Sequence, residues 1–394
     1  MEVNNITLIK YKKCCGCEAC AGACPLSLIE MKHDDAGFLY PQIIKIEECV
    51  NCGLCLKKCP VSKDNIPSKL NQRRKELFFW VKDRDELLSS SSGGLATHLY
   101  RKSLEGGVYI VGVQYTDDFM GAQYILTNDA KNMERFKGSK YIQACKNDIY
   151  NQVKKMLNSG SEVLFIGLPC EVAAMKLFSD SEKLYTCELV CHGPTSSKVL
   201  SRYISHLEER QKATVVSYTS RFKNPHWKPL NSRIIYDNGI TRTQIFADTE
   251  LGKAFQMVKR YSCYHCEYKN GVTAADLTIG DFHAANSQRG DYNPDGVSIC
   301  LVNTQRGQKI SQSLADDDVV TGVADHVAAM ANRALVESLP KLPGRERFIR
   351  IMKQNGLDVA CKDVIVVTVL KYRRYPHRAR SRIRRILRRI RATR

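Results

Sequence analysis

The chain has 394 residues, enough for two or three domains with a substantial buried core. Hydrophobic residues make up 43% and charged residues 26%, which together with only 24 Gly and 12 Pro excludes collagen-like and wholly disordered proteins. The formal net charge is +19, and 17 cysteines are present. The odd number of cysteines, and the lack of a basic start followed by an apolar run in residues 1–10, predict reduced cytoplasmic thiols.

Nine of the cysteines lie between residues 14 and 59, in two runs of the same spacing. The first run is Cys14, Cys17, Cys20 and Cys24 before Pro25, and the second is Cys49, Cys52, Cys55 and Cys59 before Pro60. In two-cluster ferredoxins such a run holds one 4Fe-4S cube with its first three thiolates, and its fourth thiolate reaches the other cube. Zinc prefers separated C-x2-C pairs instead.

This rule predicts two ligand sets. Cluster 1 takes Cys14, Cys17, Cys20 and Cys59, and cluster 2 takes Cys49, Cys52, Cys55 and Cys24. Cys15 falls outside the pattern. Residues 5–62 resemble the bacterial-type 2×4Fe-4S ferredoxin domain, so we expect residues 1–62 to form an electron-transfer domain, followed by a polar linker over 63–76.

From residue 77 onward short strands alternate with helices. We expect strands at 77–81, 108–113, 163–167 and 184–190, helices at 94–104, 149–157 and 172–178, and a further helix from beyond 196 to about 209. β-like runs follow at 214–220, 232–237, 276–280 and 297–302. The pattern predicts an α+β protein whose α/β unit has two lobes, 77–157 and 158–330, with a helical extension over 331–370.

A third group of cysteines belongs to this α/β unit. Cys263 and Cys266 form a C-x2-C pair, while Cys170 and Cys191 follow predicted strands. Because strand ends meet at a crevice in open α/β sheets, these four thiolates suit either a third 4Fe-4S cluster or zinc. The remaining Cys145, Cys187, Cys300 and Cys361 are expected to be small core residues.

Two glycine-containing turns are candidate phosphate or cofactor contacts. Residues 89–94 (SSSSGG) lead into a helix, whose start offers N–H donors to a phosphate; a simple helix cap is the alternative. In residues 138–141 (GSKY), Lys140 could neutralise a pyrophosphate or a reduced flavin, and Tyr141 could pack on a ring; an ordinary turn is the alternative. Without a G-x-G-x-x-G motif, a Rossmann nucleotide site is not indicated.

Taken in order, SSGG, GSKY, G-x-P-C, VCHG, SC-x2-C and Gly280-Asp281-Phe282 resemble the coenzyme F420 hydrogenase/dehydrogenase beta-subunit family over residues 77–330. The resemblance implies FAD bound beside a 4Fe-4S cluster, with hydride exchange at the flavin and single electrons leaving through the clusters. The implied flavin contacts are Ser91, Ser92, Gly93, Gly94, Gly138, Ser139, Lys140 and Tyr141. The implied ligands of the third cluster are Cys170, Cys191, Cys263 and Cys266.

One motif departs from the family pattern. The stretch that usually resembles G-T-P-C-Q has Leu168 and Glu171 here, and an acid beside a flavin or cluster lowers its potential. His192 and Asp281 are the titratable residues nearest these motifs and are our candidate catalytic proton relays; structural roles are the alternative. Residues 221–228 (RFKNPHWK) line a substrate mouth or form a surface hairpin.

Twelve basic residues and no acid lie between residues 371 and 394. Ile383, Ile386, Leu387 and Ile390 are spaced as one stripe of a basic amphipathic helix, which predicts docking on an anionic membrane surface or a partner. Nucleic-acid binding is disfavoured because aromatic residues are not interleaved, and a solvated tail is a third alternative. The longest apolar run, 364–370, is too short to span a membrane.

The sequence therefore predicts an iron-sulfur flavoprotein oxidoreductase. Its partners would be a ferredoxin, another redox carrier or a partner oxidoreductase, and a small organic acceptor. We expect it in the cytoplasm, with residues 372–394 attaching it to the inner face of the membrane. The alternatives are an electron-transfer subunit without its own substrate and a scaffold whose clusters are structural.

Overall fold

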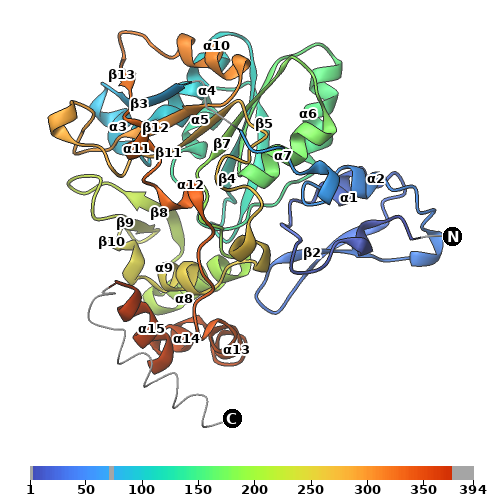
Figure 1. The fold of residues 1–394 in the computed structure, drawn as a ribbon. Coiled ribbons are helices and arrows are strands. Elements are labelled where there is room, and N and C mark those ends of the chain that lie inside the picture. Colours follow the sequence, from blue (N-terminus) through green and yellow to red (C-terminus); the bar gives the residue numbers. More distant parts are fainter. Residues whose placement is uncertain (1–2, 71–74, 375–394) are drawn as a thin grey trace.

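The computed structural model describes residues 3–70 and 75–374. The predicted amphipathic tail from residue 375 onward lies outside the described residues. An N-terminal module projects from one side of a larger α/β body, and the C-terminal helices cover the end of that body (Figure 1). The module consists of α1 (Ala19–Ala23), an antiparallel pair β1 (Ile29–His33) and β2 (Leu39–Ile43), and α2 (Leu54–Lys57). Each cysteine run enters one of the two helices and ends just beyond it, at Cys24 or Cys59.

An eight-stranded mixed sheet forms the body, in the order β13-β3-β12-β11-β7-β6-β4-β5. The strands are β3 (Lys75–Val81), β4 (Tyr109–Tyr115), β5 (Ala122–Thr127), β6 (Val163–Gly167), β7 (Leu184–Leu189), β11 (Leu277–Asp281), β12 (Ser298–Val302) and β13 (Val319–Val323). The four central strands β4, β6, β7 and β11 pair in parallel with one another, and the remaining pairings are antiparallel. The predicted strand-helix-strand unit at 163–190 is confirmed.

Helices cover both faces of this sheet. They are α3 (Arg84–Ser89), α4 (Leu95–Glu105), α5 (Lys131–Phe136), α6 (Ile149–Asn158), α7 (Pro169–Phe178) and α10 (Gln305–Ser313), whereas α8 (Ser197–Gln211) and α9 (Glu250–Met257) pack beside the small sheet described next. Along β6 alternate side chains enter different cores: Phe165 packs with residues of α6 and α7, and Leu164 with residues of α4. Burial on both faces explains why this strand is a continuous apolar run.

A second, three-stranded sheet has the order β10-β9-β8. Its strands are β8 (Val215–Phe222), β9 (Asn231–Tyr236) and β10 (Thr241–Ile245). The chain ends in short helices, α11 (His326–Ala329), α12 (Arg333–Val336), α13 (Arg345–Asn355), α14 (Leu357–Lys362) and α15 (Val364–Arg374). Helices therefore occupy most of the predicted extension over 331–370. None of the described helices is both long and apolar enough to cross a membrane.

Strands from both sides of the predicted boundary at 157/158 belong to the large sheet. Strand β4 lies before it and pairs in parallel with β6, which lies after it. A parallel pair requires a crossover connection, and here the crossover runs through α6, so both segments belong to one sheet. The second lobe of the body is instead the small β8–β10 sheet with its neighbouring helices (Figure 1).

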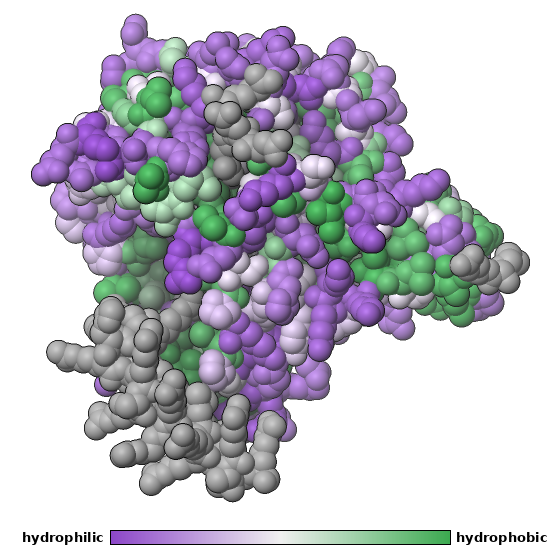
Figure 2. Space-filling view, in the orientation of Figure 1, coloured by the Kyte–Doolittle hydropathy of each residue, from purple (hydrophilic) through white to green (hydrophobic). Residues whose placement is uncertain are grey.

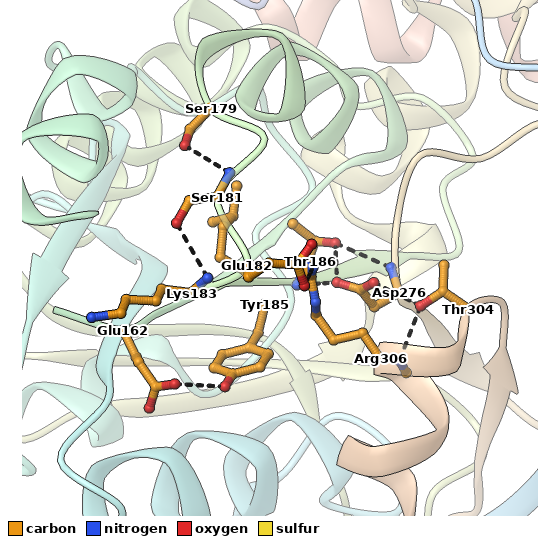
Figure 3. Close-up of polar contacts among 12 residues, drawn as sticks. Glu162, Ser179, Ser181, Glu182, Lys183, Tyr185, Thr186, Asp276, Thr304 and Arg306 are labelled. Carbon is orange, nitrogen blue, oxygen red and sulfur yellow. Dashed lines mark hydrogen bonds and ion pairs between the residues drawn. The ribbon is translucent and has the colours of Figure 1, made fainter. Parts of the chain in front are cut away.

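A buried carboxylate, Asp276, ties β7, β11 and α10 together where β7 and β11 begin (Figure 3). Its Oδ2 accepts hydrogen bonds from the Thr186 backbone N–H at 2.9 Å and from the Thr186 hydroxyl at 2.7 Å. Its Oδ1 accepts from the Thr304 hydroxyl, which also caps α10. Because both carboxylate oxygens have donors, this buried acid stabilises the sheet at the edge opposite the cavities described below.

Buried side chains of the body hold the N-terminal module through its backbone carbonyls. Tyr150 donates to the carbonyl of Cys17 at 3.0 Å, and Asn151 donates to the carbonyl of Gly22 at 2.8 Å. Further donors are Gln143 to Gly16, Arg260 to Leu39 and Tyr268 to Pro60. The guanidinium of the buried Arg260 also lies 5.0 Å from the Phe38 ring centroid. The cysteine loops are thereby fixed to the body.

We predict that Gly16→Ala lowers the unfolding free energy by more than the backbone strain of a positive φ would explain. Gly16 has a φ of +67°, and a Cβ there would overlap the Arg260 guanidinium. Gly239 has a φ of +80° with nothing within 4 Å of a Cβ at that position, so Gly239→Ala is the matched control. The control should lose about 1–2 kcal/mol of unfolding free energy, and Gly16→Ala about 1–3 kcal/mol more. Anaerobic urea denaturation measures both; equal losses would contradict the packing role assigned to Arg260.

Candidate functional site: a series of cysteine-lined cavities leading to a large pocket

The structure brings both predicted ferredoxin ligand sets together. One small cavity is lined by Cys14, Cys17, Cys20 and Cys59, and another by Cys24, Cys49, Cys52 and Cys55. Each set combines three thiols of one run with the last thiol of the other, as the ferredoxin rule requires. Among the residues that the structure describes, no three or more His, Cys, Asp or Glu side chains lie close enough together to hold a single metal ion.

The third cysteine group also converges on one cavity, of about 230 Å³. Cys170 lies in the first turn of α7, Cys191 follows β7, and Cys263 and Cys266 lie at a 3-10 helix over Tyr261–His265. Gly193 permits this convergence: its φ is +81°, and a Cβ there would lie 2.8 Å from the Cβ of Cys263. All four predicted thiols therefore line the same space.

The environment of these thiols suits a metal centre. Burial raises the pKa of Cys263 to about 12 and that of Cys266 to about 11. A buried thiolate needs a compensating cation, and iron bound to sulfur supplies one. The chemistry of the donor set therefore fits a cluster that takes four thiolates.

Cys15 is a fifth thiol in this region, and the spacing argument left it without a role. It lines both the cluster 1 cavity and the third cysteine cavity. Hydrogen bonds with the thiols of Cys17 and Cys170 hold the pKa of Cys15 well below its ordinary value. The only sequence signal for this position is its place inside the first cysteine run.

A cavity of about 540 Å³ opens beside the carboxyl ends of the central parallel strands. Its lining includes seven of the eight predicted flavin contacts, namely Ser91, Ser92, Gly94, Gly138, Ser139, Lys140 and Tyr141. The start of α4 at Leu95 also faces it, as the helix-start argument predicts. Ser91 and Ser139 are joined by a 3.2 Å hydrogen bond, so the two predicted turns meet.

Gly93 and Lys140 differ from the prediction. Gly93 does not line the cavity; it packs against the backbone of Phe79 and Ser298, which leaves no room for a side chain. The ammonium of Lys140 donates to three carbonyls, those of Arg135, Phe136 and Lys137, at 2.9, 3.0 and 2.7 Å. Because its three donors cap the end of α5, Lys140 is a cavity wall and not a free cation for a pyrophosphate.

The start of the 221–228 segment is not a surface hairpin. Arg221 is buried at the end of β8, lines the large cavity, and its Nη1 lies 3.0 and 2.8 Å from the two carboxylate oxygens of Asp281. Lys223 is buried too, and donates to the carbonyls of Leu87 and Ser92. Arg221 therefore lines a cavity, as the substrate-mouth alternative expected, whereas Lys223 binds carbonyls of the protein itself.

The two predicted proton relays reach the cavity wall in different states. Asp281 is engaged in the ion pair with Arg221. His192 lines both the large cavity and the third cysteine cavity, and burial together with Lys259 and Lys269 lowers its pKa to about 4. His192 is therefore neutral at physiological pH, and its lowered pKa makes it a weak proton acceptor there.

The cavities adjoin one another in a row. Cys15 and Val61 line both the cluster 1 cavity and the third cysteine cavity. The segment 191–194, with Leu168 and Glu171, lines both the third cysteine cavity and the large cavity. A route therefore leads from the cluster 1 cavity through the third cysteine cavity to the large cavity, and each cavity shares lining residues with the next.

Comparisons with known proteins identify both parts of this arrangement. Residues 13–63 match the family model of the 4Fe-4S dicluster domain. Residues 160–324 match the family model for the C terminus of the coenzyme F420 hydrogenase/dehydrogenase beta subunit. Over residues 160–324 the chain therefore carries the C-terminal domain of the coenzyme F420 hydrogenase/dehydrogenase beta-subunit family, as the motifs predicted. It is an iron-sulfur protein of an oxidoreductase family.

Individual relatives of this beta-subunit-family protein are distant. The F subunit of the F(420)H(2) dehydrogenase of Methanosarcina mazei is 22% identical over 327 residues, which cover 79% of this chain and 84% of that protein. Among solved structures, a chain of the F420-reducing [NiFe] hydrogenase complex from Methanosarcina barkeri is 19% identical, with a TM-score of 0.47. That match covers 74% of this chain and 91% of the other.

Glu171, where this beta-subunit-family chain departs from the expected Gln, is compensated inside the protein. Its Oε1 lies 2.6 Å from the ammonium of Lys146, with both side chains almost fully buried, and the Tyr124 hydroxyl donates to its Oε2. Burial alone would lower the pKa of Lys146, but Glu171 and Glu18 together raise it. The acid beside Cys170 is therefore paired, and its effect on a neighbouring redox centre is partly offset.

We predict that Lys146→Met destabilises the protein by about 3–5 kcal/mol, because it leaves the Glu171 carboxylate buried without its cation. The double variant Lys146→Met/Glu171→Gln should recover part of this loss, since the Glu171 charge is removed together with its cation and only Glu18 still lacks its interaction with Lys146. Lys45→Met, which removes an exposed partner of Glu48, should change the unfolding free energy by less than about 1 kcal/mol. Urea unfolding of the four proteins gives the comparison; no recovery in the double variant would contradict the pairing.

Proposed function

We propose that the chain is an iron-sulfur flavoprotein oxidoreductase that passes electrons between its N-terminal 4Fe-4S clusters and a flavin, which exchanges hydride with an organic substrate. The observation that carries this proposal is the series of cavities with shared walls, from the cluster 1 cysteines through Cys15 to the large cavity. In this proposal Cys170, Cys191, Cys263 and Cys266 hold a third cluster, and FAD occupies the large cavity.

The residues of the large cavity support a flavin by what they provide. The first turn of α4 offers N–H donors and the positive end of a helix dipole to a pyrophosphate, beside the hydroxyls of Ser91 and Ser92. Tyr141 packs with Phe246 and Phe255 at centroid distances of 4.8 and 4.7 Å, forming an aromatic wall for a planar ring. A bound flavin would supply the conversion between hydride and single-electron transfer.

Partner docking is supported by the surface of the N-terminal module. Cys52, a proposed cluster 2 ligand, is exposed. Apolar residues gather on this module (Figure 2). The exposed ones are Val3, Leu8, Tyr11, Leu26, Ile44, Ile46, Val50 and Leu54. An apolar face over an exposed cluster suits a redox carrier or a partner oxidoreductase, because electron transfer needs close approach and a dry contact.

Iron content tests the cluster assignment. Anaerobically purified protein should contain about 12 Fe per chain, and Cys263→Ser/Cys266→Ser should contain about 8, because one cluster loses two of its ligands. Cys145→Ser is the matched control: Cys145 is exposed, contrary to its predicted place in the core, and lines none of the four cavities. About 8 Fe in the unaltered protein would remove the third cluster from the proposal.

Flavin content separates the enzyme from the alternative of an electron-transfer subunit. We expect about one FAD per chain, and bleaching or reoxidation of that flavin by a small hydride donor or acceptor in the absence of any partner protein. Flavin absorbance in an anaerobic cuvette measures both. Protein that carries its clusters but no flavin would be an electron-transfer subunit without its own substrate.

A further inference from the structure

We propose that His283 transfers a proton to or from an organic substrate in the large cavity, with Asp281 and Trp227 as the positioning residues that hold its ring. This inference rests on the proposed function, because it concerns the proton that accompanies hydride exchange in the same cavity. It names a catalytic residue that the motifs did not predict. It also names a substrate class, a compound whose reduction places an electron pair on an oxygen or a nitrogen.

The first step is the access of a ligand to His283. This residue lies two positions beyond the end of β11, at the carboxyl edge of the sheet where the large cavity opens. Its side chain lines the cavity and is 40% exposed, so a molecule in the cavity can contact the imidazole. Neither ring nitrogen has a hydrogen bond to another described residue. The imidazole is therefore available to exchange a proton with a bound substrate.

The second step is the support of the imidazole ring. Its Nε2 lies 3.9 Å from Oδ2 of Asp281, which is an ion-pair distance and too long for a hydrogen bond. Arg221 holds that carboxylate in place through its own ion pair. The ring also stacks on the buried Trp227, with centroids 5.8 Å apart and planes 13° apart. A carboxylate beside an imidazole orients it and stabilises its protonated form, so the pair has the parts of a proton relay.

The third step compares the other acids and bases of the described cavity wall. Lys140 spends its three donors on carbonyls, and Lys137 and Glu171 are each engaged in an ion pair. His192 has two lysines beside it, whose charges disfavour a further cation there. Among the histidines that line the described part of the cavity, His283 is therefore the one with a carboxylate at ion-pair distance.

The fourth step is the balance of the reaction. Electrons that arrive through iron-sulfur clusters bring no protons, so a substrate that is reduced must obtain its proton from another group. When a hydride forms a C–H bond with an unsaturated carbon, an electron pair moves to an attached or conjugated oxygen or nitrogen. That atom takes the proton of His283: an imidazolium N–H bond breaks as the new O–H or N–H bond forms. Neutral His283 then regains a proton from water, and oxidation of the substrate follows the reverse course.

The surroundings of His283 give this reaction a definite pH dependence. Partial burial lowers the pKa of His283, Asp281 on β11 raises it, and Lys228 and Arg221 lower it, with the result below the ordinary histidine value. His192, beyond β7, is the other titratable neighbour. Because His283 must be protonated to donate, transfer to an acceptor becomes faster as the pH falls through this lowered pKa. Transfer in the opposite direction needs the neutral ring and becomes slower over the same range.

The test uses the full chain, purified anaerobically with its flavin and reduced with dithionite, and 5-deazariboflavin as the probe. This probe takes a hydride at a ring carbon and a proton at a ring nitrogen, and it is a poor acceptor of single electrons. Stopped-flow absorbance over a range of pH measures the transfer. His283→Gln should slow it at least about hundredfold and remove both its pH dependence and its solvent deuterium isotope effect. His326→Gln, which removes an exposed histidine paired with Glu76 outside the cavity, should match the unaltered chain.

Further variants separate proton transfer from a structural role. His283→Ala should be rescued in part by added imidazole, which can occupy the vacated space and donate the proton, whereas a structural histidine would give no such recovery. Asp281→Asn should move the pH profile to lower pH, because it removes the charge that stabilises the imidazolium. Trp227→Leu should slow the transfer without moving the profile, and Trp227→Phe, which keeps an aromatic ring, should recover much of the rate.

Flavin content and the unaltered chain distinguish this inference from the proposed function. An unaltered chain without flavin, or with flavin but no transfer to the probe, would overturn the proposed function and the inference with it. Normal transfer in the unaltered chain and equal transfer in His283→Gln would overturn the inference alone. Loss of flavin from His283→Gln, with no rescue of His283→Ala by imidazole, would also overturn it, because His283 would then hold the cofactor. Retained flavin, slow transfer and recovery with imidazole are the results we expect.

Discussion

The attachment of the cysteine loops to the body is the interaction on which the rest of this structure depends. These loops form little secondary structure of their own, so the carbonyls of residues such as Gly16, Cys17 and Gly22 need outside donors. The body provides these donors from α6, from Gln143 before it, and from Arg260 and Tyr268, which line the third cysteine cavity. A module held in this way keeps the predicted cluster 1 cysteines at a fixed distance from Cys170 and its neighbours.

Because neighbouring cavities share lining residues, the cluster 1 cavity, the third cysteine cavity and the large cavity follow one another in space. The N-terminal module and the body each contain only part of this series. Cys15 faces cluster 1 on one side and the third cysteine cavity on the other. The segment 191–194 then separates that cavity from the pocket that contains Arg221. Two acids beside this route are paired inside the protein, Glu171 with Lys146 and Asp281 with Arg221.

Local patterns predicted the cysteine sets and most central elements, because ligand spacing and strand periodicity are properties of neighbouring residues. Strand β5 has no strict apolar-polar alternation and the sequence of β10 is largely polar, so neither gives the usual signal of a strand. The position of β3 between β12 and β13 depends on antiparallel pairing over more than two hundred residues, which no local pattern encodes. For the same reason the burial of Arg221 and the use of Lys140 as a helix cap appeared only in three dimensions.

The Gly193 turn, which brings Cys191 against Cys263, also has a consequence for folding. Between these two cysteines the chain makes an excursion of about seventy residues that contains α8, α9 and the whole β8–β10 sheet. A metal cluster bound by both cysteines would act as a cross-link that closes this loop and restricts its unfolded conformations. Loss of iron would then loosen β8, the strand that carries Arg221, so the large cavity and the electron route would be disturbed together.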